Sequence, residues 1–329
     1  MIFELLCAFG GAVAITVVAG LVLIPALRRM KAGQSIREDG PVWHNKKQGT
    51  PTMGGLMFVA GIAIACLVVG IPQMIRGELS HLFIIIFAVI FGMIGFLDDF
   101  SKIKKKRNLG LKALPKFLLQ LVVAVGFLLL MWYTGNLTTS LYVPFFNVTI
   151  SIAEPVYFIF AAFVIVGTVN SVNITDGVDG LATGVSIPVA VFYAVVAFLW
   201  GYEAIGIFSA ALAGGLVGFL IFNFHPAKVF MGDTGSLFLG GAVCATAFAL
   251  NMPLILLPLG FVYFVETLSD IIQVTYFKLS GGKRVFKMAP LHHHFEMCGW
   301  NEYKLFAVFT GVSLIFAVVS YFGVASRGL

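Results

Sequence analysis

The residues of this chain best suited to chemistry are carboxylates that lie beside long apolar segments. Asp98 and Asp99 end one apolar run, Asp176 and Asp179 follow another, and Asp233 precedes a third. Charged groups at membrane depth are costly, so an acid in such a place usually marks a functional site or a bonded pair. Carboxylate oxygens are also ligands that suit Mg²⁺. The first hypothesis is therefore a site at which several of these acids meet a cation.

The adjacent pair Asp98 and Asp99 is placed at the C-terminal end of an expected helix. That end carries partial negative charge, so two neighbouring carboxylates there are disfavoured unless a cation or a proton compensates them. Lys102 and the lysines at 104–106 support a second interpretation, in which the pair is only a solvated helix end neutralised by its neighbours. Both interpretations stay open at this stage.

Four amide or acid side chains recur every third residue in the segment 170–181. They are Asn170, Asn173, Asp176 and Asp179, and glycines interrupt the end of the series. Hydrogen-bonding groups concentrated in a loop between two apolar runs suit a polar ligand. The alternative is an Asn/Asp/Gly turn with side-chain caps, but a simple turn needs fewer polar residues.

The segment 223–236 contains Asp233, Thr234 and Ser236 just before an apolar run. These residue types commonly cap a helix through their side-chain oxygens. The same helix start offers backbone N–H groups and a positive dipole end to a phosphate, and Asp233 offers hard oxygen to Mg²⁺. Capping and metal binding are compatible here.

Three consecutive histidines, His292, His293 and His294, lie in the segment 290–296. Neighbouring side chains point apart, and no thiolate or spaced histidine completes a zinc pattern. The triplet suits anion or sugar contacts, with a plain surface loop as the alternative.

A Gly/Thr-rich stretch with lysines, residues 43–55, precedes the second apolar run. Its lysines suit either a phosphate or anionic lipid head groups, and for this run alone the lipid interpretation is favoured. Glu266 and Asp270 lie inside a later apolar run, and Gln273 follows Asp270 by about one turn. Bonding between helices is the favoured role for Glu266, and the role of Asp270 is open.

The elements that must position these groups are membrane helices. The chain is 60% hydrophobic and 11% charged, with a mean hydropathy of +1.00, which is typical of a polytopic helical membrane protein. We expect an all-α integral membrane fold in which residues 1–329 form one polytopic domain. Ten spans are predicted, at residues 2–27, 52–71, 80–97, 115–133, 154–172, 181–200, 203–222, 235–250, 253–277 and 303–324.

The distribution of basic residues predicts the orientation. With both termini outside, the inner segments hold all but two of the 21 Lys and Arg, the exceptions being Arg76 and Arg327. Inner, cytoplasmic loops are enriched in these residues, so an even number of spans is favoured. Those inner segments are residues 28–51, 98–116, 223–234 and 278–304. The acids then share the cytoplasmic face, and the β-branched stretch 143–151 predicts a small β-hairpin outside.

The chemistry implied by this placement is phosphoryl transfer. The formal charge of +6 could suggest nucleic acid, but the basic residues belong to loops beside a membrane, so no nucleic-acid partner is expected. A transporter or flippase would place paired charges nearer the midplane, at broken helices in repeated halves, and neither is evident. Acids for Mg²⁺ beside lysines and histidines for phosphate favour an enzyme that positions and neutralises phosphate groups.

Taken in order, these motifs resemble the polyprenyl-phosphate N-acetylhexosamine-1-phosphate transferase superfamily over essentially the whole chain. The matching segments are residues 47–55, Asp98 with Asp99, residues 170–181, residues 230–236 and residues 290–296. The histidine triplet favours the branch that transfers phospho-N-acetylmuramoyl-pentapeptide. Relatives that use UDP-N-acetylglucosamine have a differently composed last inner loop and form the nearest alternative.

The resemblance implies transfer of phospho-N-acetylmuramoyl-pentapeptide from its UDP carrier to undecaprenyl phosphate, giving lipid I and UMP with Mg²⁺. This is the first membrane step of peptidoglycan synthesis, at the cytoplasmic face of the bacterial inner membrane. A homodimer is compatible with the sequence.

The resemblance also implies residue roles. Asp233 would bind the metal, Asp98 would be the base on the lipid phosphate, and Asp99 would support the site. Residues implied at the nucleotide and phosphates are Asn173, Asp176, Asp179, Asn223 and Phe230, the last stacking on uracil. Residues implied at the phosphates, sugar or peptide are Lys47, Thr52, Lys116 (in preference to Lys112), Gln273, His292, His293 and His294.

Overall fold

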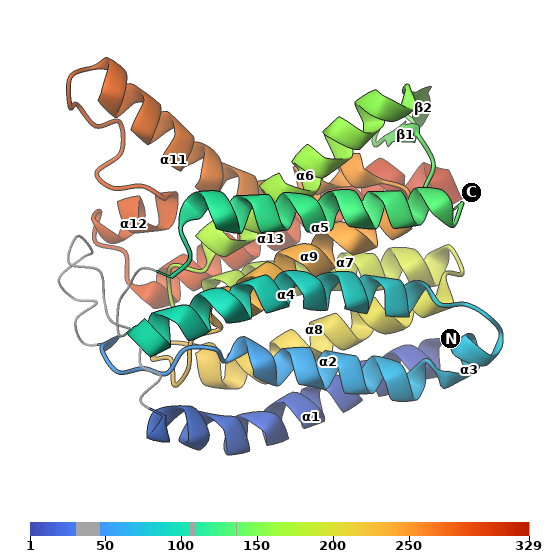
Figure 1. Cartoon of the computed structure of the whole chain (residues 1–329), viewed down its shortest axis with the longest axis horizontal. Coiled ribbons are helices and arrows are strands. Elements are labelled where there is room, and N and C mark those ends of the chain that lie inside the picture. Colours follow the sequence, from blue (N-terminus) through green and yellow to red (C-terminus); the bar gives the residue numbers. More distant parts are fainter. Residues whose placement is uncertain (31–46, 106–109, 136, 329) are drawn as a thin grey trace.

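The computed structural model describes residues 1–30, 47–105, 110–135 and 137–328 as a bundle of long helices with one small sheet (Figure 1). The expected all-α class is confirmed. The helices are α1 (Ile2–Arg29), α2 (Gly55–Val69), α3 (Ile71–Ile75), α4 (Ser80–Lys105), α5 (Ala113–Tyr133), α6 (Glu154–Thr175), α7 (Leu181–Leu199), α8 (Glu203–Asn223), α9 (Gly232–Ala249), η2 (Pro253–Ile255), α10 (Leu256–Leu259), α11 (Phe261–Leu279), α12 (Leu291–Glu296), α13 (Glu302–Val324) and η3 (Ala325–Gly328).

Seven of the helices in the described part of the chain are long and apolar enough to cross a membrane: α1, α4, α5, α6, α7, α8 and α13. A broken pair, Pro253–Leu259 with Phe261–Leu279, adds an eighth candidate. The 15-residue α2 is a shorter apolar helix. Each of the ten expected spans thus coincides with a helix or a helix pair, whereas the number that crosses the membrane stays a prediction.

The expectation of one continuous helix over 253–277 is wrong. The chain bends by 79° between Pro253–Leu259 and Phe261–Leu279. Pro258 and Gly260 flank the break, and these are the residue types that remove a backbone donor or weaken a helix interior. The bend directs α11 away from the bundle (Figure 1).

The centre of the bundle is α9, which packs on α4, α6 and α2. Every residue from 234 to 248 is buried. Close approach depends on glycines, as is common between membrane helices. A Cβ on Gly95 of α4 would lie 2.0 Å from the backbone oxygen of Asp233. This packing brings the C-terminal end of α4 against the first turn of α9.

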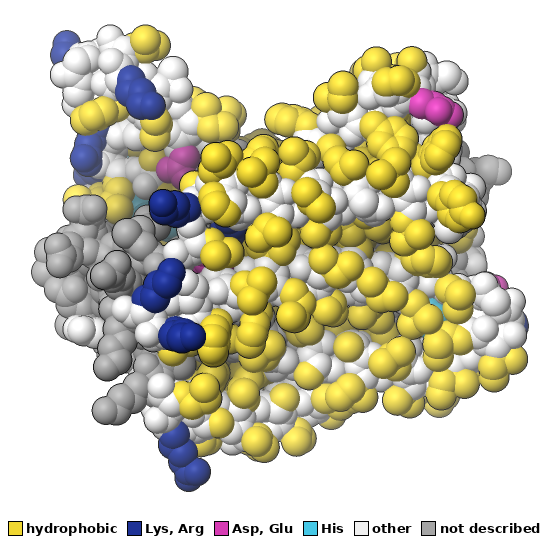
Figure 2. Space-filling view, viewed as in Figure 1, with side chains coloured by type: hydrophobic (Ala, Val, Ile, Leu, Met, Phe, Trp, Pro, Cys, Tyr) yellow, Lys and Arg dark blue, Asp and Glu magenta, His cyan; other side chains and the backbone are white. Residues whose placement is uncertain are grey.

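The outside of the bundle is apolar around its middle. Figure 2 shows hydrophobic side chains covering the face formed by α1, α2, α4 and α5, whereas Lys and Arg gather at one end. A broad exposed apolar belt is what a lipid-facing surface requires. Both chain termini lie at the opposite end from the basic side chains (Figures 1 and 2). The orientation with both termini outside stays a prediction.

The expected hairpin is present. Strands β1 (Ser140–Val143) and β2 (Val148–Ser151) pair antiparallel, with Ser140 opposite Ser151. Residues 144–147 turn between them, with Phe145 and Asn147 at positive φ. The hairpin lies at the end of the bundle where the termini lie (Figure 1).

Candidate active site

Three carboxylates meet where α4 packs on α9. Asp98 and Asp99 lie near the end of α4 and are each only 2% exposed, and Asp233 lies in the first turn of α9. One oxygen from each lies within 4.8 Å of the others. Because like charges at this separation repel, a cation or a shared proton must compensate them. The two acids of α4 are therefore part of a buried site, and the interpretation of them as a solvated helix end is wrong.

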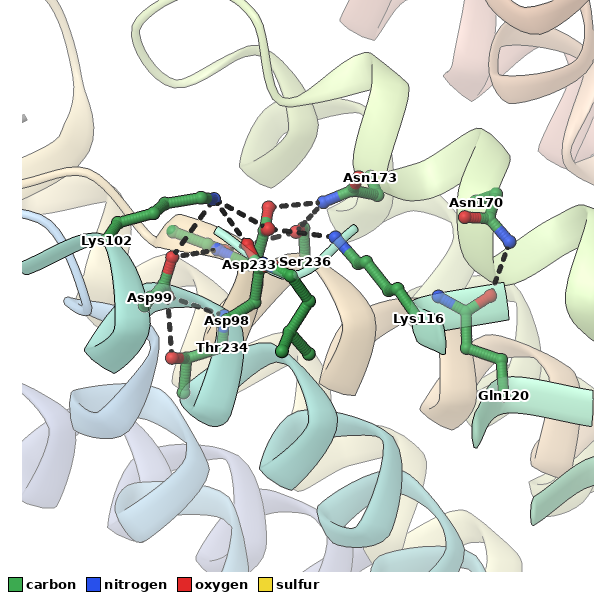
Figure 3. A network of polar contacts seen from close by, with 12 residues as sticks. Asp98, Asp99, Lys102, Lys116, Gln120, Asn170, Asn173, Asp233, Thr234 and Ser236 are labelled. Atoms are coloured by element: carbon green, nitrogen blue, oxygen red, sulfur yellow. Dashed lines mark hydrogen bonds and ion pairs between the residues drawn. The ribbon is translucent and has the colours of Figure 1, made fainter. Parts of the chain in front are cut away.

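Two lysines supply the compensating charge (Figure 3). The Lys102 Nζ lies 2.6 Å from Asp98 Oδ2, 2.8 Å from Asp233 Oδ2 and 3.7 Å from Asp99 Oδ1. Lys116, from α5, places its Nζ 2.8 Å from the same Asp233 Oδ2. We call these five residues, Asp98, Asp99, Lys102, Lys116 and Asp233, the Asp233 cluster.

Asp99 caps α9 from the neighbouring helix. Its carboxylate accepts hydrogen bonds from the backbone N–H groups of Asp233 (3.2 Å) and Thr234 (2.9 Å) and from the Thr234 hydroxyl (2.7 Å). The expected capping by side chains from the start of α9 itself is wrong, since no such bond is made at the cap. Two of the N–H groups expected to be free for a phosphate are also used by Asp99. The carboxylate of Asp233 is therefore not needed as a cap and can bind other groups.

Asn173 of α6 holds the other side of Asp233. Its amide Nδ2 donates to Asp233 Oδ1 at 2.9 Å and lies 2.7 Å from Ser236 Oγ. Thr52 is buried beside the cluster, because a Cβ on Gly232 would lie 2.7 Å from its hydroxyl. Gly232 has φ +69° and would also place a Cβ 2.5 Å from Asp99, so glycine is required there.

A second group of charged residues, here called the Asp179 cluster, consists of Lys47, Asp179, His225 and Glu302. Lys47 Nζ lies 2.8 Å from Asp179 Oδ1 and 2.7 Å from Glu302 Oε2. His225 Nδ1 lies 2.9 Å from Asp179 Oδ2. These residues line a cavity of about 370 Å³.

The surroundings of Asp176 and Asp179 shift the pKa values of their carboxyls in opposite directions. Burial raises the pKa of Asp179, but the Lys47 ammonium, the Ala227 N–H and His225 outweigh it, so that pKa lies below its usual value. Burial and then repulsion from Asp233, Asp99 and Asp179 raise the pKa of Asp176 to about 8. Asp176 follows α6 and is influenced by both clusters.

In the histidine segment, residues 290–296, the short helix α12 (Leu291–Glu296) carries all three histidines, and each of them is hydrogen-bonded. His292 Nδ1 lies 2.8 Å from Glu266 Oε2, and His293 Nδ1 lies 2.6 Å from Glu296 Oε2. His294 Nδ1 accepts from the backbone N–H of Lys287 at 3.1 Å. The three neighbouring histidines therefore have three different environments.

Two further residues of the expected site are bonded within the protein. Gln273 accepts from the backbone N–H groups of Val285 and Phe286 and donates to the Phe286 carbonyl. Asn223 is buried, accepts from the Thr183 hydroxyl at 2.8 Å and donates to the Val229 carbonyl at 3.0 Å.

Phe230 is half-buried, and its backbone is joined to the segment before α2. Its N–H donates to the Pro51 carbonyl at 2.9 Å, and its own carbonyl accepts from Gly54 at 2.8 Å.

The Asp233 cluster fits a hard divalent cation. Three carboxylates within reach of one another, without thiolate or imidazole, suit Mg²⁺ better than Zn²⁺. Asp99 is already occupied by donors that belong to α9, and Asp98 Oδ1 accepts the backbone N–H of Leu111 at 2.6 Å. Lysine contacts the remaining oxygen, Oδ2, of both Asp98 and Asp233. The two latter residues are therefore the better ligands.

Known proteins resemble the chain over almost its full length. The glycosyl transferase family 4 model matches residues 81–251, and residues 47–59 match phospho-N-acetylmuramoyl-pentapeptide-transferase signature 1. A phospho-N-acetylmuramoyl-pentapeptide-transferase of Caldanaerobacter subterraneus subsp. tengcongensis is 48% identical over 313 residues, covering 94% of this chain and 96% of the relative. The chain belongs to the phospho-N-acetylmuramoyl-pentapeptide-transferase family.

Other relatives that carry this name agree. One from Staphylococcus aureus is 49% identical over 311 residues, 94% of this chain and 95% of its own. One from Clostridium botulinum is 47% identical over 312 residues, 94% of this chain and 93% of its own. The family that the motifs indicated is thereby confirmed.

Three residues join the clusters without having been singled out from the sequence as site residues. Lys102 lies one helical turn after Asp98, so its position on the same face was predictable. Glu302, an acid in the inner segment 278–304, pairs with Lys47 across 255 residues. His225 contacts Asp179 across 46 residues, and local spacing carries no signal for either contact.

Some residues considered in the sequence lie outside the described part of the chain. They are residues 43–46 and Lys106. The described lysines next to it, Lys104 and Lys105, are exposed.

Proposed function

We propose that this chain transfers phospho-N-acetylmuramoyl-pentapeptide from its UDP carrier to undecaprenyl phosphate, forming lipid I and UMP. The observation that carries the proposal is the convergence of three carboxylates and two ammonium groups from α4, α5 and α9 in an otherwise apolar bundle. Phosphoryl transfer consists largely of positioning and charge neutralisation, and this cluster supplies both. Membership of the family supports the choice of donor and acceptor.

Asp233, together with Asp98, would hold Mg²⁺. When bound, the metal neutralises charge on the donor diphosphate and on the departing UMP. Lys102 and Lys116 then become free to contact phosphate oxygens, because the metal takes over the charge that they compensate. Asn173 keeps the Asp233 carboxylate oriented through its Oδ1.

The reaction makes one bond between phosphorus and oxygen and breaks another. A phosphate oxygen of the lipid attacks the phosphorus attached to the sugar, and UMP leaves with the electron pair of the broken bond. Asp98 would accept the proton of the lipid phosphate or orient it, and since that group has a second pKa of about 6, an ordinary carboxylate suffices. Direct attack and a phospho-aspartate intermediate both balance this reaction.

The Asp179 cluster is the proposed nucleotide end of the site. Its cavity of about 370 Å³ is lined by groups that both donate and accept hydrogen bonds, among them Lys47 and Asp179. We assign Phe230 to stacking on uracil, in keeping with the family, and Asp176 to the region between the nucleotide and the Asp233 cluster. Thr52, Asn223, Gln273 and the histidine segment are assigned to shaping or contacting the donor.

The proposed topology has ten spans, both termini outside and the site at the cytoplasmic face of the bacterial inner membrane. Its support is the end-to-end asymmetry of basic side chains in Figure 2.

The decisive experiment measures UMP release by the purified protein in detergent with Mg²⁺ and undecaprenyl phosphate. UDP-N-acetylmuramoyl-pentapeptide and UDP-N-acetylglucosamine are supplied in parallel, and the expected result is turnover of the muramoyl donor. Turnover of the glucosamine donor alone would contradict the proposal. Absence of UMP release, with binding intact, would favour a carrier.

A further inference from the structure

The buried acid Glu266 forms a pair with His292. Glu266, on α11, is 0% exposed, and His292, on α12, is 1% exposed. The carboxylate Oε2 lies 2.8 Å from His292 Nδ1, and the other oxygen accepts the backbone N–H of His292 at 3.2 Å. Both the ring and the main chain of His292 are thus fixed to one carboxylate.

This pairing determines which ring nitrogen carries hydrogen. An ionised carboxylate only accepts hydrogen bonds, so Nδ1 must be the donor. Among the described residues, His292 is the one ionisable side chain in salt-bridge contact with Glu266. Because a buried carboxylate requires such a donor, the orientation of the ring follows from Glu266.

The other ring nitrogen, Nε2, is buried and has no hydrogen-bond partner in the described structure. It faces Gly177, since a Cβ added to that glycine would lie 2.1 Å from it. Gly177 directly follows Asp176 and is two residues before Asp179. The unpartnered nitrogen therefore borders the segment that runs between the two clusters.

The neighbouring histidines differ from His292 in this respect. His293 pairs with Glu296 within the same short helix, and His294 accepts from Lys287 seven residues earlier in the same loop. The partners just named lie within seven residues, whereas Glu266 lies on another helix, 26 residues away. A nitrogen that is held by a distant acid and has no partner of its own is suited to receive one from a ligand.

We propose that Glu266 is a positioning residue for the transferase: it holds His292 so that Nε2 accepts a hydrogen bond from a hydroxyl of the bound nucleotide sugar beside the Asp176–Gly177 turn. The inference rests on the proposed function. It assigns the contact to one of the three histidines and gives a role to a membrane-embedded acid. Gly177 is the position that leaves room for the ring.

The test uses the full-length protein in detergent and compares E266Q, E266D, H292N and the double variant E266Q/H292N. D270N is the matched control, because Asp270 is an acid one turn further along α11. For E266Q we expect the kcat/KM for the muramoyl donor to fall by about 10- to 100-fold, as is typical when a supporting carboxylate is removed. KM for the donor should rise while KM for undecaprenyl phosphate stays unchanged, a division that general destabilisation does not produce.

The double variant should be no worse than H292N alone, because both changes remove one contact. E266D, which keeps the charge on a shorter side chain, should retain more activity than E266Q, and D270N should stay within twofold of the wild type. The proposal is overturned if E266Q behaves like D270N or if the losses in E266Q and H292N multiply. If E266Q does not fold, H292N decides: an unchanged KM for the donor overturns the proposal.

Failure of this inference is distinguishable from failure of the proposed function. A wild-type protein that releases no UMP contradicts the function itself. A wild-type protein that releases UMP, with E266Q equally active, contradicts only the role of Glu266.

Discussion

Asp233 and Asp179 are both acids beside lysines, but they are held by different kinds of donor. Asp233 is contacted by the side chains of Lys102, Lys116 and Asn173. Asp179 is contacted by Lys47 and His225 and also by the backbone N–H of Ala227. The lysine contacts of Asp233 share a single oxygen, Oδ2.

This difference distinguishes carboxylates whose partners can change from carboxylates that the fold holds in place. A flexible lysine side chain can move when a metal or a phosphate arrives, whereas a backbone N–H remains where the fold places it. Asp99 follows the pattern of Asp179, since two of its three donors are backbone groups. Asp98 combines both kinds of donor, because Lys102 contacts its Oδ2 and the backbone N–H of Leu111 donates to its Oδ1 at 2.6 Å. We infer that Asp233 and the Oδ2 of Asp98 exchange partners during the reaction and that Asp99 and Asp179 shape the site.

The largest expected effect comes from Asp233→Asn. The variant loses an anionic oxygen at the centre of the cluster, so UMP release should fall by more than about 100-fold, the upper range for supporting residues. Binding of Mn²⁺ as a probe for Mg²⁺, followed by electron paramagnetic resonance, should weaken in parallel. Asp179→Asn is the matched control and should retain Mn²⁺ binding. Equal loss of Mn²⁺ binding in both variants would contradict the distinction between the two clusters.

Asp98→Asn should reduce turnover far more than donor binding. Its carboxylate is assigned to the lipid phosphate, and the amide cannot accept a proton. Steady-state kinetics should show a lower kcat with KM for the UDP donor within a few-fold of the wild type. A normal kcat in this variant would show that Asp98 is not one of the reacting groups.

Asp99→Ala should act on stability before chemistry. The change removes a cap that serves two backbone N–H groups of α9, and losing a cap costs about 0.5–2 kcal/mol. Thermal unfolding in detergent should occur several degrees below the wild type. Thr234→Val, which removes only the hydroxyl donor, should have a smaller effect in the same assay. Wild-type stability in Asp99→Ala would show that this acid is exchangeable after all.

The sequence predicts the Asp233 cluster better than the Asp179 cluster for a physical reason. Asp98, Asp99 and Lys102 share one helix, and positive-inside topology places the start of α9 at the same face. Glu302 and His225 reach Asp179 only through the packing of α13 and the loop after α8, which no local pattern encodes.

The helices themselves are well predicted because apolar length is a strong signal. The 79° bend before α11 is not, since Pro258 and Gly260 allow a break without requiring one. Because that bend determines where Glu266 lies, its pairing with His292 could not be predicted from the sequence either.

The last comparison follows the thermal unfolding of variants at Asp176 and Asp179 as a function of pH, in metal-free protein. The pKa of Asp176 is raised to about 8, so the folded protein binds an extra proton above the unfolded pKa of about 3.9, and this acid lowers stability as pH rises through that window. The pKa of Asp179 is lowered, so its contribution is present above the unfolded value and is lost as pH falls through the folded one. Asp176→Asn should therefore unfold at a higher temperature than the wild type at pH 9 and at about the same temperature at pH 4. Asp179→Asn should unfold at a lower temperature than the wild type at pH 7, with the difference shrinking towards pH 3. Shifts of the same sign in both variants would contradict the opposite environments of these two neighbouring acids.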